Sequence, residues 1–379
     1  RYKDGLDLQH NGMKFNVEMS FNKDTLKKKL QTICAEYEIK AQNASLEATG
    51  HGFKIIKEKE GVTVDYDKTV EQLYTYVTEK WNKKANIKLT ATTTVSKPKY
   101  TTEDCEKVSN EPMGSYTTEF SVGSSYANRN LNIQNGAKLI NGAVVYPGEQ
   151  YSCNENLYPW TEDNGWHPAG TYVDGGVQDS LGGGICQVSS TLYNALLRAE
   201  IKVVKRFPHS MAVGYVPLSA DAALAGDYKD LVFENDTDAP IYVQGIYNSG
   251  GSITFNIYGH DTRKAGHSVK YESKTVKTTP VKTQTKKDSS KPVGYSEVES
   301  SGHVGYVAEL WKITYENGKQ VSKELIHTST YAMSPTIVVK GTKKASTTTK
   351  KDDSDKDDKK SSEKTTKKST SSKKSKKSE

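Results

Sequence analysis

The chain has 379 residues, a hydrophobic content of 34% and a formal net charge of +7 at pH 7. This length suffices for two or three domains, and no apolar run reaches the length that a membrane-spanning helix needs. Residues 343–379 contain 14 lysines against seven acidic residues, so this tail carries the whole net charge and residues 1–342 are neutral. Because the tail lacks aromatic and large aliphatic residues, we expect it to be disordered. It is either a tether to an anionic polymer or surface or a solubilising tail.

Charge and cysteine spacing argue against several classes of function. The folded part shows no basic stripe and no RNA-binding motif, so nucleic acid is not an expected partner. The chain begins at Arg1 rather than at Met, which is compatible with an export signal or a membrane anchor upstream. The four cysteines predict neither a zinc site nor a dense disulfide framework, because they lie far apart without a CxxC pair: Cys34, Cys105, Cys153 and Cys186.

Residues 1–100 are typical of a mixed α+β domain. They contain no catalytic constellation, and we interpret the isolated His10 and His51 as surface or turn residues. Apolar spacing predicts two helices and three strands: helices from Asn22 and over 67–81, and strands over 53–56, 62–64 and 88–95, the first two strands flanking a turn at Glu60 and Gly61.

A polar connection over 101–115 leads into a second domain over 116–261. Its pattern predicts an α+β domain in which a helix packs against an antiparallel sheet. The expected elements are strands over 116–122, 231–233, 241–243 and 253–258, a short helix from Asn128, and a helix from Cys186 to about Arg198.

The second domain is organised around residues 181–193, LGGGICQVSSTLY. Three glycines free the backbone, and the apolar residues after them follow the period of a helix. Cys186 therefore starts a helix, where unpaired N–H groups and the helix dipole favour a thiolate. The Cys186 and Gln187 N–H groups, in a loop with Gly183 and Gly184, are the expected oxyanion donors. The alternative is a buried structural cysteine.

A nucleophilic thiol needs a base at neutral pH, and His209 is the best placed of the eight histidines. The helix carries the chain about 18 Å away from Cys186, and the ten or so residues up to His209 can span about 33 Å. A return strand over 211–215 can therefore bring His209 back beside Cys186. His167 is the competing candidate.

An acceptor that orients the imidazole would complete a Cys-His-Asp arrangement. Asp221, which follows a turn-like segment at 217–220, is favoured, with Asp227 and Asp230 as alternatives. The aromatic loop that contains Trp166 either forms a platform for a sugar or peptide or covers the core.

Several segments between residues 116 and 260 resemble the VanW domain. The most specific is GGGICQVS at 182–189, and the other segments occur in the family's order. These are Arg129 in NRNLN, PGEQYS at 147–152, residues 206–210, Asp221-Ala222, and DLVFEN at 230–235.

The flanking regions resemble domains that accompany VanW. The N-terminal unit is similar to the peptidoglycan-binding domain that often precedes it. Residues 262–342 resemble a G5 domain, a small β-rich domain, through the order of their glycines, and Asn317-Gly318 predicts a hairpin turn. Residues 275–292 are rich in Lys and Thr and are interpreted as a linker or loose edge.

The VanW resemblance implies L,D-transpeptidation of peptidoglycan through the motif cysteine. Cys186 would attack the carbonyl of the third residue of a tetrapeptide stem and expel the terminal D-alanine. The side-chain amine of a diaminopimelate on a neighbouring stem would resolve the thioester and give a 3-3 cross-link, without a metal or a cofactor. The predicted substrate contacts are Arg129, Arg206, Tyr215 and Trp166.

The implied partners are peptidoglycan stem peptides and glycan, with anionic wall polymers for the tail. The implied location is the cell wall or the membrane-anchored surface of a Gram-positive bacterium. Two alternatives remain open. One is a cysteine peptidase or carboxypeptidase that passes the same thioester to water, and the other is a wall-binding protein without catalytic activity.

Overall fold

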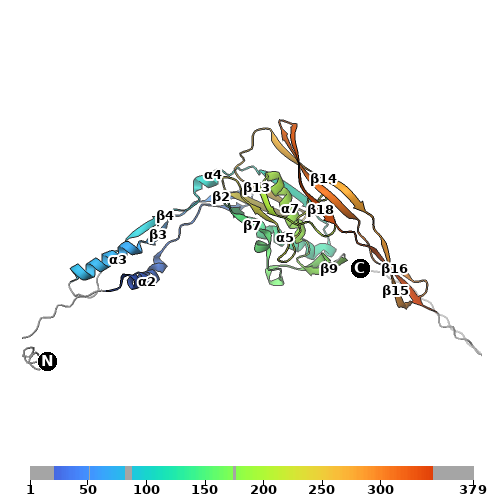
Figure 1. Cartoon of the computed structure of the whole chain (residues 1–379), viewed down its shortest axis with the longest axis horizontal. Helices are drawn as coiled ribbons and strands as arrows, with labels where there is room; N and C mark the ends of the chain where they lie inside the picture. Colours follow the sequence, from blue (N-terminus) through green and yellow to red (C-terminus); the bar gives the residue numbers. More distant parts are fainter. Residues whose placement is uncertain (1–20, 51, 82–87, 174–175, 345–379) are drawn as a thin grey trace, which may run out of the picture. The chain divides into compact units, whose positions relative to one another are not determined.

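The computed structural model describes residues 21–50, 52–81, 88–173 and 176–344 (Figure 1). Within them the chain is a multidomain α+β protein with antiparallel sheets, as predicted. None of its described helices is long and apolar enough to cross a membrane. The chain divides into two compact units, Arg1–Gln284 with Val298–Val338, and Thr285–Glu297 with Val339–Glu379. His10, His51 and most of the predicted disordered tail lie outside the described residues.

The N-terminal region contains the predicted helices, but its strands pair differently from the prediction. Asn22 caps the first helix by accepting the Thr25 N–H at 2.9 Å. The strand at 53–56 pairs with the strand that precedes it, residues 45–49, and the strand at 61–64 pairs with residues 93–96. The two strands that flank Glu60-Gly61 therefore do not form the expected hairpin. The elements are α2 (Lys23–Cys34), η1 (Ala35–Tyr37), β1 (Ser45–Thr49) paired with β2 (Gly52–Ile56), β3 (Gly61–Val64) paired with β4 (Thr93–Ser96), α3 (Tyr66–Thr75) and η2 (Tyr76–Lys80).

The polar connection contains a short helix, α4 (Thr102–Glu106). A capping box between Thr101 and Asp104 starts it. Its Cys105 is fully buried and packs with Ala44, Leu46 and Tyr242, so the connection is part of a small core.

The second domain is built on a four-stranded antiparallel sheet in the order β5-β13-β12-β6. Two helices, α5 (Ala127–Ile140) and α7 (Ile185–Ala199), pack on the sheet through apolar stripes. Val188, Leu192 and Leu196 of α7 are completely buried in this core, together with Phe255 of the sheet. The strands are β5 (Gly114–Glu119), β6 (Ala143–Val145), β12 (Ile241–Asn248) and β13 (Ser252–Tyr258).

Smaller elements complete the second domain. A three-stranded sheet in the order β10-β11-β7 and a hairpin of β8 and β9 are joined by loops and short helices. The return strand predicted at 211–215 is wrong: residues 206–231 form turns and loop with one isolated bridge between Ala225 and Lys229. Hydrogen bonds to the Asp221 side chain hold the segment in place of a strand ladder. The elements are η3 (Ser124–Tyr126), β7 (Gln150–Ser152), α6 (Cys153–Leu157), η4 (Glu162–Asn164), β8 (Pro168–Val173), β9 (Gly176–Leu181), β10 (Lys202–Lys205) and β11 (Val232–Glu234).

Between residues 262 and 344, the part of the C-terminal region that the structure describes, the chain forms β-strands joined by turns and loops. The predicted turn at Asn317-Gly318 is confirmed, with positive φ at both residues, and it joins β17 to β18. Residues 275–292 are not a linker, because their threonines and lysines form long strands whose side chains are largely exposed. Both strands lie at the edge of a sheet, which agrees with the alternative prediction of an edge region. One sheet contains β14 (His267–Thr279), β17 (Gly305–Glu316) and β18 (Lys319–Tyr331), and another contains β15 (Thr283–Pro292), β19 (Thr336–Lys343) and β16 (Ser296–Ser300).

Candidate active site

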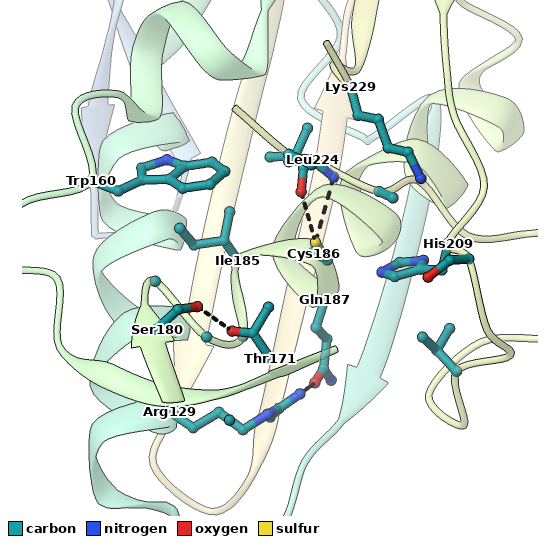
Figure 2. Close-up of a pocket in the computed structure, with 18 of the residues that line it drawn as sticks. Arg129, Trp160, Thr171, Ser180, Ile185, Cys186, Gln187, His209, Leu224 and Lys229 are labelled. Atoms are coloured by element: carbon teal, nitrogen blue, oxygen red, sulfur yellow. Dashed lines mark hydrogen bonds between the residues drawn. The ribbon is translucent and has the colours of Figure 1, made fainter. Parts of the chain in front are cut away.

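A pocket of about 380 Å³ opens at the N-terminal end of α7 (Figure 2). Its walls come from the glycine loop with the first turn of α7, the β8–β9 hairpin, the loop that carries His209 and the loop that precedes β11, with Arg129 of α5 and Trp160 of the aromatic loop added. The lining includes Arg129, Trp160, Thr171, Ser180, Gly182–Gly184, Cys186, Gln187, His209, Tyr215, Leu224, Tyr228 and Lys229.

The glycine loop places Cys186 in the first turn of α7. Gly184 precedes the helix with a φ of 108°, a conformation that a residue with a Cβ rarely adopts. Gly183 has no room for a side chain, because a Cβ there would lie 2.4 Å from the Ala169 carbonyl oxygen. Cys186 is half-buried and faces the pocket. Its Sγ accepts the Leu224 N–H at 3.4 Å and lies at the same distance from the Leu224 carbonyl oxygen (Figure 2).

His209 and Asp221 form a hydrogen-bonded pair at the same pocket. The His209 Nδ1 lies 2.6 Å from Asp221 Oδ2, and the His209 backbone N–H donates to that oxygen at 2.7 Å. The other ring nitrogen, Nε2, lies 3.3 Å from the Tyr215 hydroxyl. Asp221 thus fixes the orientation of the imidazole through Nδ1, and Nε2 lies on the side of the ring that carries the pocket residue Tyr215.

The other oxygen of Asp221 has two donors of its own. Arg206 Nη2 donates to Oδ1 at 2.7 Å, and the Tyr331 hydroxyl donates to it at 2.5 Å. Asp221 is completely buried, so its charge is compensated by partners rather than by water.

These contacts favour an ion pair between a thiolate and an imidazolium. Burial raises the pKa of the Cys186 thiol, but hydrogen bonding and charge from His209 outweigh burial and lower it. Burial lowers the pKa of His209, but its bonds to Asp221 and Cys186 raise that pKa to about 9. Burial also raises the pKa of Asp221, yet His209 and the charge of Arg206 hold it well below the ordinary value. The site therefore favours the thiolate of Cys186 more than the surroundings of an ordinary free cysteine do.

The remaining cysteines have a different environment. All four cysteines are free thiols, and Cys105 and Cys153 are completely buried. Burial raises the pKa of Cys105 to about 11 and raises that of Cys153 well above its ordinary value. Both thiols should therefore be unreactive in the folded protein.

The predicted substrate contacts divide into two pairs. Arg129 and Tyr215 line the pocket, whereas Trp166 is fully buried in the core of the domain. Arg206 does not line the pocket either, because its guanidinium is paired with Asp221. The role of substrate contact is therefore corrected for these two residues, and for Trp166 the structure agrees with the alternative that the aromatic loop covers the core.

The structure also corrects one predicted oxyanion donor. The Gln187 N–H already donates to the Gly184 carbonyl oxygen at 3.0 Å. The Gln187 side chain instead fixes the first turn of α7, accepting from Arg129 Nη2 at 2.6 Å and donating to Thr118 Oγ1 at 2.9 Å. Gly183 and Gly184 line the pocket as expected.

The competing acid and base candidates lie elsewhere. His167 does not line this pocket, and its backbone N–H donates to Asn132. Asp230 accepts from the Ser152 hydroxyl at 2.7 Å and from the Asn154 N–H at 3.0 Å, which fixes the start of α6.

Several pocket residues were not predicted from the sequence. Trp160 lines the pocket in place of Trp166, which lies in the same aromatic loop, and Lys229 adds a positive charge. Only the clustering of aromatic residues could have indicated Trp160. The Leu224 N–H, a backbone group, leaves no residue-type signal at all. Within the described residues, no group of three or more His, Cys, Asp or Glu side chains could hold a metal ion.

Family comparisons match three segments of the chain. Residues 128–258 match the family described as "VanW like protein", residues 270–343 match the "G5 domain", and residues 1–86 match the "Putative peptidoglycan binding domain". The G5 and peptidoglycan binding families are related to the cell wall, which indicates a location outside the cytoplasm.

Two curated relatives share the central part of the chain. "Uncharacterized protein YoaR" of Bacillus subtilis (strain 168) is 37% identical over 164 residues, which cover 43% of this chain and 53% of that protein. "Vancomycin B-type resistance protein VanW" of Enterococcus faecalis (strain ATCC 700802 / V583) is 28% identical over 116 residues, which cover 29% and 42%. The chain thus spans about half the length of these relatives or less.

Two solved G5 structures match the C-terminal region. "IgA1 Protease G5 domain structure" is 30% identical with a TM-score of 0.17, covering 22% of this chain and 96% of that one. "Crystal structure of HP0197-G5" is 23% identical with a TM-score of 0.14, covering 20% and 97%. By the family matches, the chain combines segments similar to a peptidoglycan binding domain, to a VanW-like domain that contains the pocket, and to a G5 domain, as predicted from the sequence.

Proposed function

We propose that this protein is a cysteine L,D-transpeptidase that forms 3-3 cross-links between diaminopimelate residues of peptidoglycan stems. The observation that carries the proposal is that Cys186 and His209 line one pocket while the buried Asp221 binds the His209 ring behind it, an arrangement that favours thiolate and imidazolium. A cysteine that only packed the helix would need none of these partners.

In the acylation step, the Cys186 thiolate attacks the carbonyl carbon of the third stem residue. The tetrahedral intermediate collapses as the bond to the D-alanine nitrogen breaks, and the His209 imidazolium donates its proton to that nitrogen. D-alanine leaves with its amine, a thioester remains on Cys186, and His209 becomes neutral. Asp221 stabilises the charged imidazole before this transfer and keeps the ring oriented after it.

In the second step, the side-chain amine of a diaminopimelate on another stem attacks the thioester. Neutral His209 accepts a proton from the attacking nitrogen, the carbon–sulfur bond breaks, and the Cys186 thiolate is restored. The product is an amide between two diaminopimelate residues. Attack by water would instead release a tripeptide, so exclusion of water from the pocket decides between the two reactions.

The pocket's charge suits a stem peptide. Arg129 and Lys229 both line it, and a stem offers carboxylates at the terminal D-alanine and on diaminopimelate that cations can bind. Trp160 and Tyr228 add aromatic surface to the same walls. A volume of about 380 Å³ suits the end of a peptide rather than a whole stem.

The test is an assay of the purified chain with disaccharide-tetrapeptides that contain diaminopimelate, with products identified by mass. We expect cross-linked dimers and free D-alanine. Cys186→Ala should abolish both products. Cys34→Ser, which removes the other partly exposed thiol, is the matched control and should leave both unchanged.

Two other product patterns would each contradict the proposal and support one of the alternatives. Tripeptides without dimers, lost in Cys186→Ala, would make the protein a carboxypeptidase that uses the same thioester. Unchanged tetrapeptide with all variants, together with co-sedimentation of the protein with peptidoglycan, would make it a wall-binding protein without catalysis.

A further inference from the structure

Three side chains of β18 lie against the loop that presents Asp221. They are His327, Ser329 and Tyr331, and their alternate positions along the strand put them on one face. All three belong to the segment that matches the G5 domain, beyond the VanW match that ends at residue 258. The carboxylate of the candidate site therefore has contacts that its own domain does not supply.

Tyr331 makes the most direct of these contacts. Its hydroxyl donates to Asp221 Oδ1 at 2.5 Å and accepts the Ser219 N–H at 2.6 Å. Tyr331 is 2% exposed, so water cannot readily replace either bond. One hydroxyl thus links the catalytic carboxylate to the backbone two residues before it.

The neighbouring positions hold the same loop. Ser329 Oγ accepts from Arg206 Nη1 at 2.9 Å and lies 2.8 Å from Ser219 Oγ. His327 Nε2 lies 2.7 Å from the Ser219 carbonyl oxygen. Burial and the charge of Arg206 lower the pKa of His327 to about 4, so the ring is neutral and donates its Nε2–H.

Ser219 needs this support because its backbone is strained. It has a φ of 67°, in the left-handed region that residues other than glycine rarely adopt, and it is completely buried. Its N–H, carbonyl and hydroxyl groups each contact a β18 side chain. The strand therefore fixes the conformation of the loop from which Asp221 reaches His209.

We propose that Tyr331 is a positioning residue of the active site: it holds one oxygen of Asp221 so that the other faces His209, and the G5 domain thereby completes the site. This inference rests on the proposed use of Cys186 and His209 as a reactive pair. Without the hydroxyl, Oδ1 keeps Arg206 as its donor but the carboxylate can turn, and the Ser219 N–H is left unpaired in the core. The imidazolium then stabilises the thiolate less well.

The experiment compares Tyr331→Phe with Tyr306→Phe in the full-length chain carrying Cys34→Ser. Tyr306 lies directly across from Tyr331 on β17, so it is a matched tyrosine of the same sheet. The readout is the rate of Cys186 alkylation by iodoacetamide between pH 5 and pH 10, followed by mass, with the unfolding temperature of each variant as a control. No peptidoglycan substrate is needed.

We expect Tyr331→Phe to move the alkylation profile to higher pH and to slow alkylation at pH 6.5 about tenfold, the size of a lost bond to a charged group. Tyr306→Phe should keep the parent profile. Ser329→Ala, which keeps Tyr331, should move the profile in the same direction by less, and it serves as the test if Tyr331→Phe does not fold.

An unchanged profile in a folded Tyr331→Phe would overturn the inference. Equal shifts in Tyr331→Phe and Tyr306→Phe would also overturn it, because the effect would then come from general packing of the sheet. The two proposals fail separately: a shifted profile without cross-linking keeps the role of Tyr331 and removes the transpeptidase. Cross-linking with an unshifted profile does the reverse.

Discussion

Each oxygen of the Asp221 carboxylate accepts two hydrogen bonds. Two donors come from His209 and one each from Arg206 and Tyr331, and no part of the side chain reaches water. A carboxylate held this firmly cannot rotate to follow its partner. The imidazole consequently adopts the orientation that the carboxylate imposes.

Replacing Asp221 with Asn tests both its charge and its geometry. We expect Asp221→Asn to lower the free energy of unfolding by about 3 kcal/mol, because Arg206 remains buried beside an uncharged group. Since the folded-state pKa of Asp221 lies below its ordinary value, the carboxylate stabilises the fold above pH ~4, and this contribution is lost as the pH falls further. Urea unfolding at pH 7 and pH 3 measures the difference, which should shrink at pH 3.

Asp230→Asn is the matched control for that substitution. Asp230 is also a buried aspartate of the same domain, but it binds Ser152 and the start of α6. Asp230→Asn should lower the free energy of unfolding while leaving the alkylation rate of Cys186 unchanged, whereas Asp221→Asn should lower both. Equal losses of Cys186 reactivity in the two variants would mean that Asp221 acts only through folding.

The reactivity of Cys186 should depend on His209 in a defined pH range. The thiolate and imidazolium coexist above the lowered pKa of Cys186 and below the His209 pKa of about 9. In a Cys34→Ser background, we expect alkylation of Cys186 to persist at pH 6.5, and we expect His209→Gln to slow it at least tenfold there. Peptide mapping of the alkylated protein gives the site. Comparable rates for Cys105 or Cys153 would contradict the assignment.

The sequence named Cys186, His209 and Asp221 as candidates from local signals, and the structure places Cys186 and His209 at one pocket and Asp221 beside His209. The sequence could not separate Trp160 from Trp166, since two tryptophans six positions apart give the same composition signal, and only packing places one in the core. Tyr331 had no signal at all. Its partner, Asp221, lies 110 residues earlier in the sequence. The alternation of residues in a strand shows which side chains share a face, but not which loop that face contacts.

At the scale of elements, the glycine loop fixes the distance between α7 and the β8–β9 hairpin. Gly183 allows the loop to pass against the Ala169 carbonyl, and the Asn132 side chain donates to the Gly183 carbonyl oxygen at 2.9 Å. The loop, the hairpin and α5 are therefore joined at one point beneath the pocket.

Gly183→Ala should disturb this junction. The added methyl group would meet a backbone oxygen at 2.4 Å, so β8 or the loop must move. We expect a loss of about 1–3 kcal/mol in the free energy of unfolding and slower alkylation of Cys186. Gly214→Ala is the control, because a Cβ at Gly214 meets nothing within 4 Å although this glycine lines the same pocket. Equal stability of the two variants in urea would contradict the prediction.

Local patterns predicted helices better than strand partners. The helix at α7 is specified by its own apolar stripe. The pairing of β2 with β1, by contrast, depends on the short connection after Thr49, which local patterns did not distinguish from the turn signal at Glu60-Gly61. The long strands β14 and β15 were missed because exposed threonine and lysine lack the apolar alternation of a half-buried strand. The conformation of loop 206–231 depends on hydrogen bonds to the buried Asp221 carboxylate, and a hydrophobic periodicity cannot predict such bonds.

At the scale of the whole chain, a charged cluster joins the end of α7 to the C-terminal sheet. Glu200, which ends the helix in a left-handed conformation, pairs with His267 at 2.7 Å and with Lys312 at 2.6 Å. His267 also pairs with Glu316 at 2.9 Å. These side chains connect the VanW-like domain to β14 and β17 near the opposite end of α7 from Cys186.

This cluster should make stability depend on pH. Hydrogen bonds from Glu316 and Glu200 raise the pKa of His267 above its ordinary value. The protonated ring therefore stabilises the fold fully below pH ~6.5, and this contribution disappears as the pH rises through the raised pKa. We expect His267→Gln to lower the Tm by a few degrees at pH 6 and by less at pH 9. Calorimetry checks this, and an equal loss at both values would show that the charge of His267 is not involved.

The contacts of β18 with the Asp221 loop limit how this chain can have been assembled by recombination. A domain that is shuffled freely must end at a surface, so that any neighbour can replace the one it left. Here three side chains at alternate positions of β18, in the segment that matches the G5 domain, contact the loop that carries Asp221 in the segment that matches VanW. A chimera given a foreign G5 sequence would keep the sheet but lose the tyrosine hydroxyl, unless the donor happened to carry one at that position. The two modules should therefore be inherited as a pair.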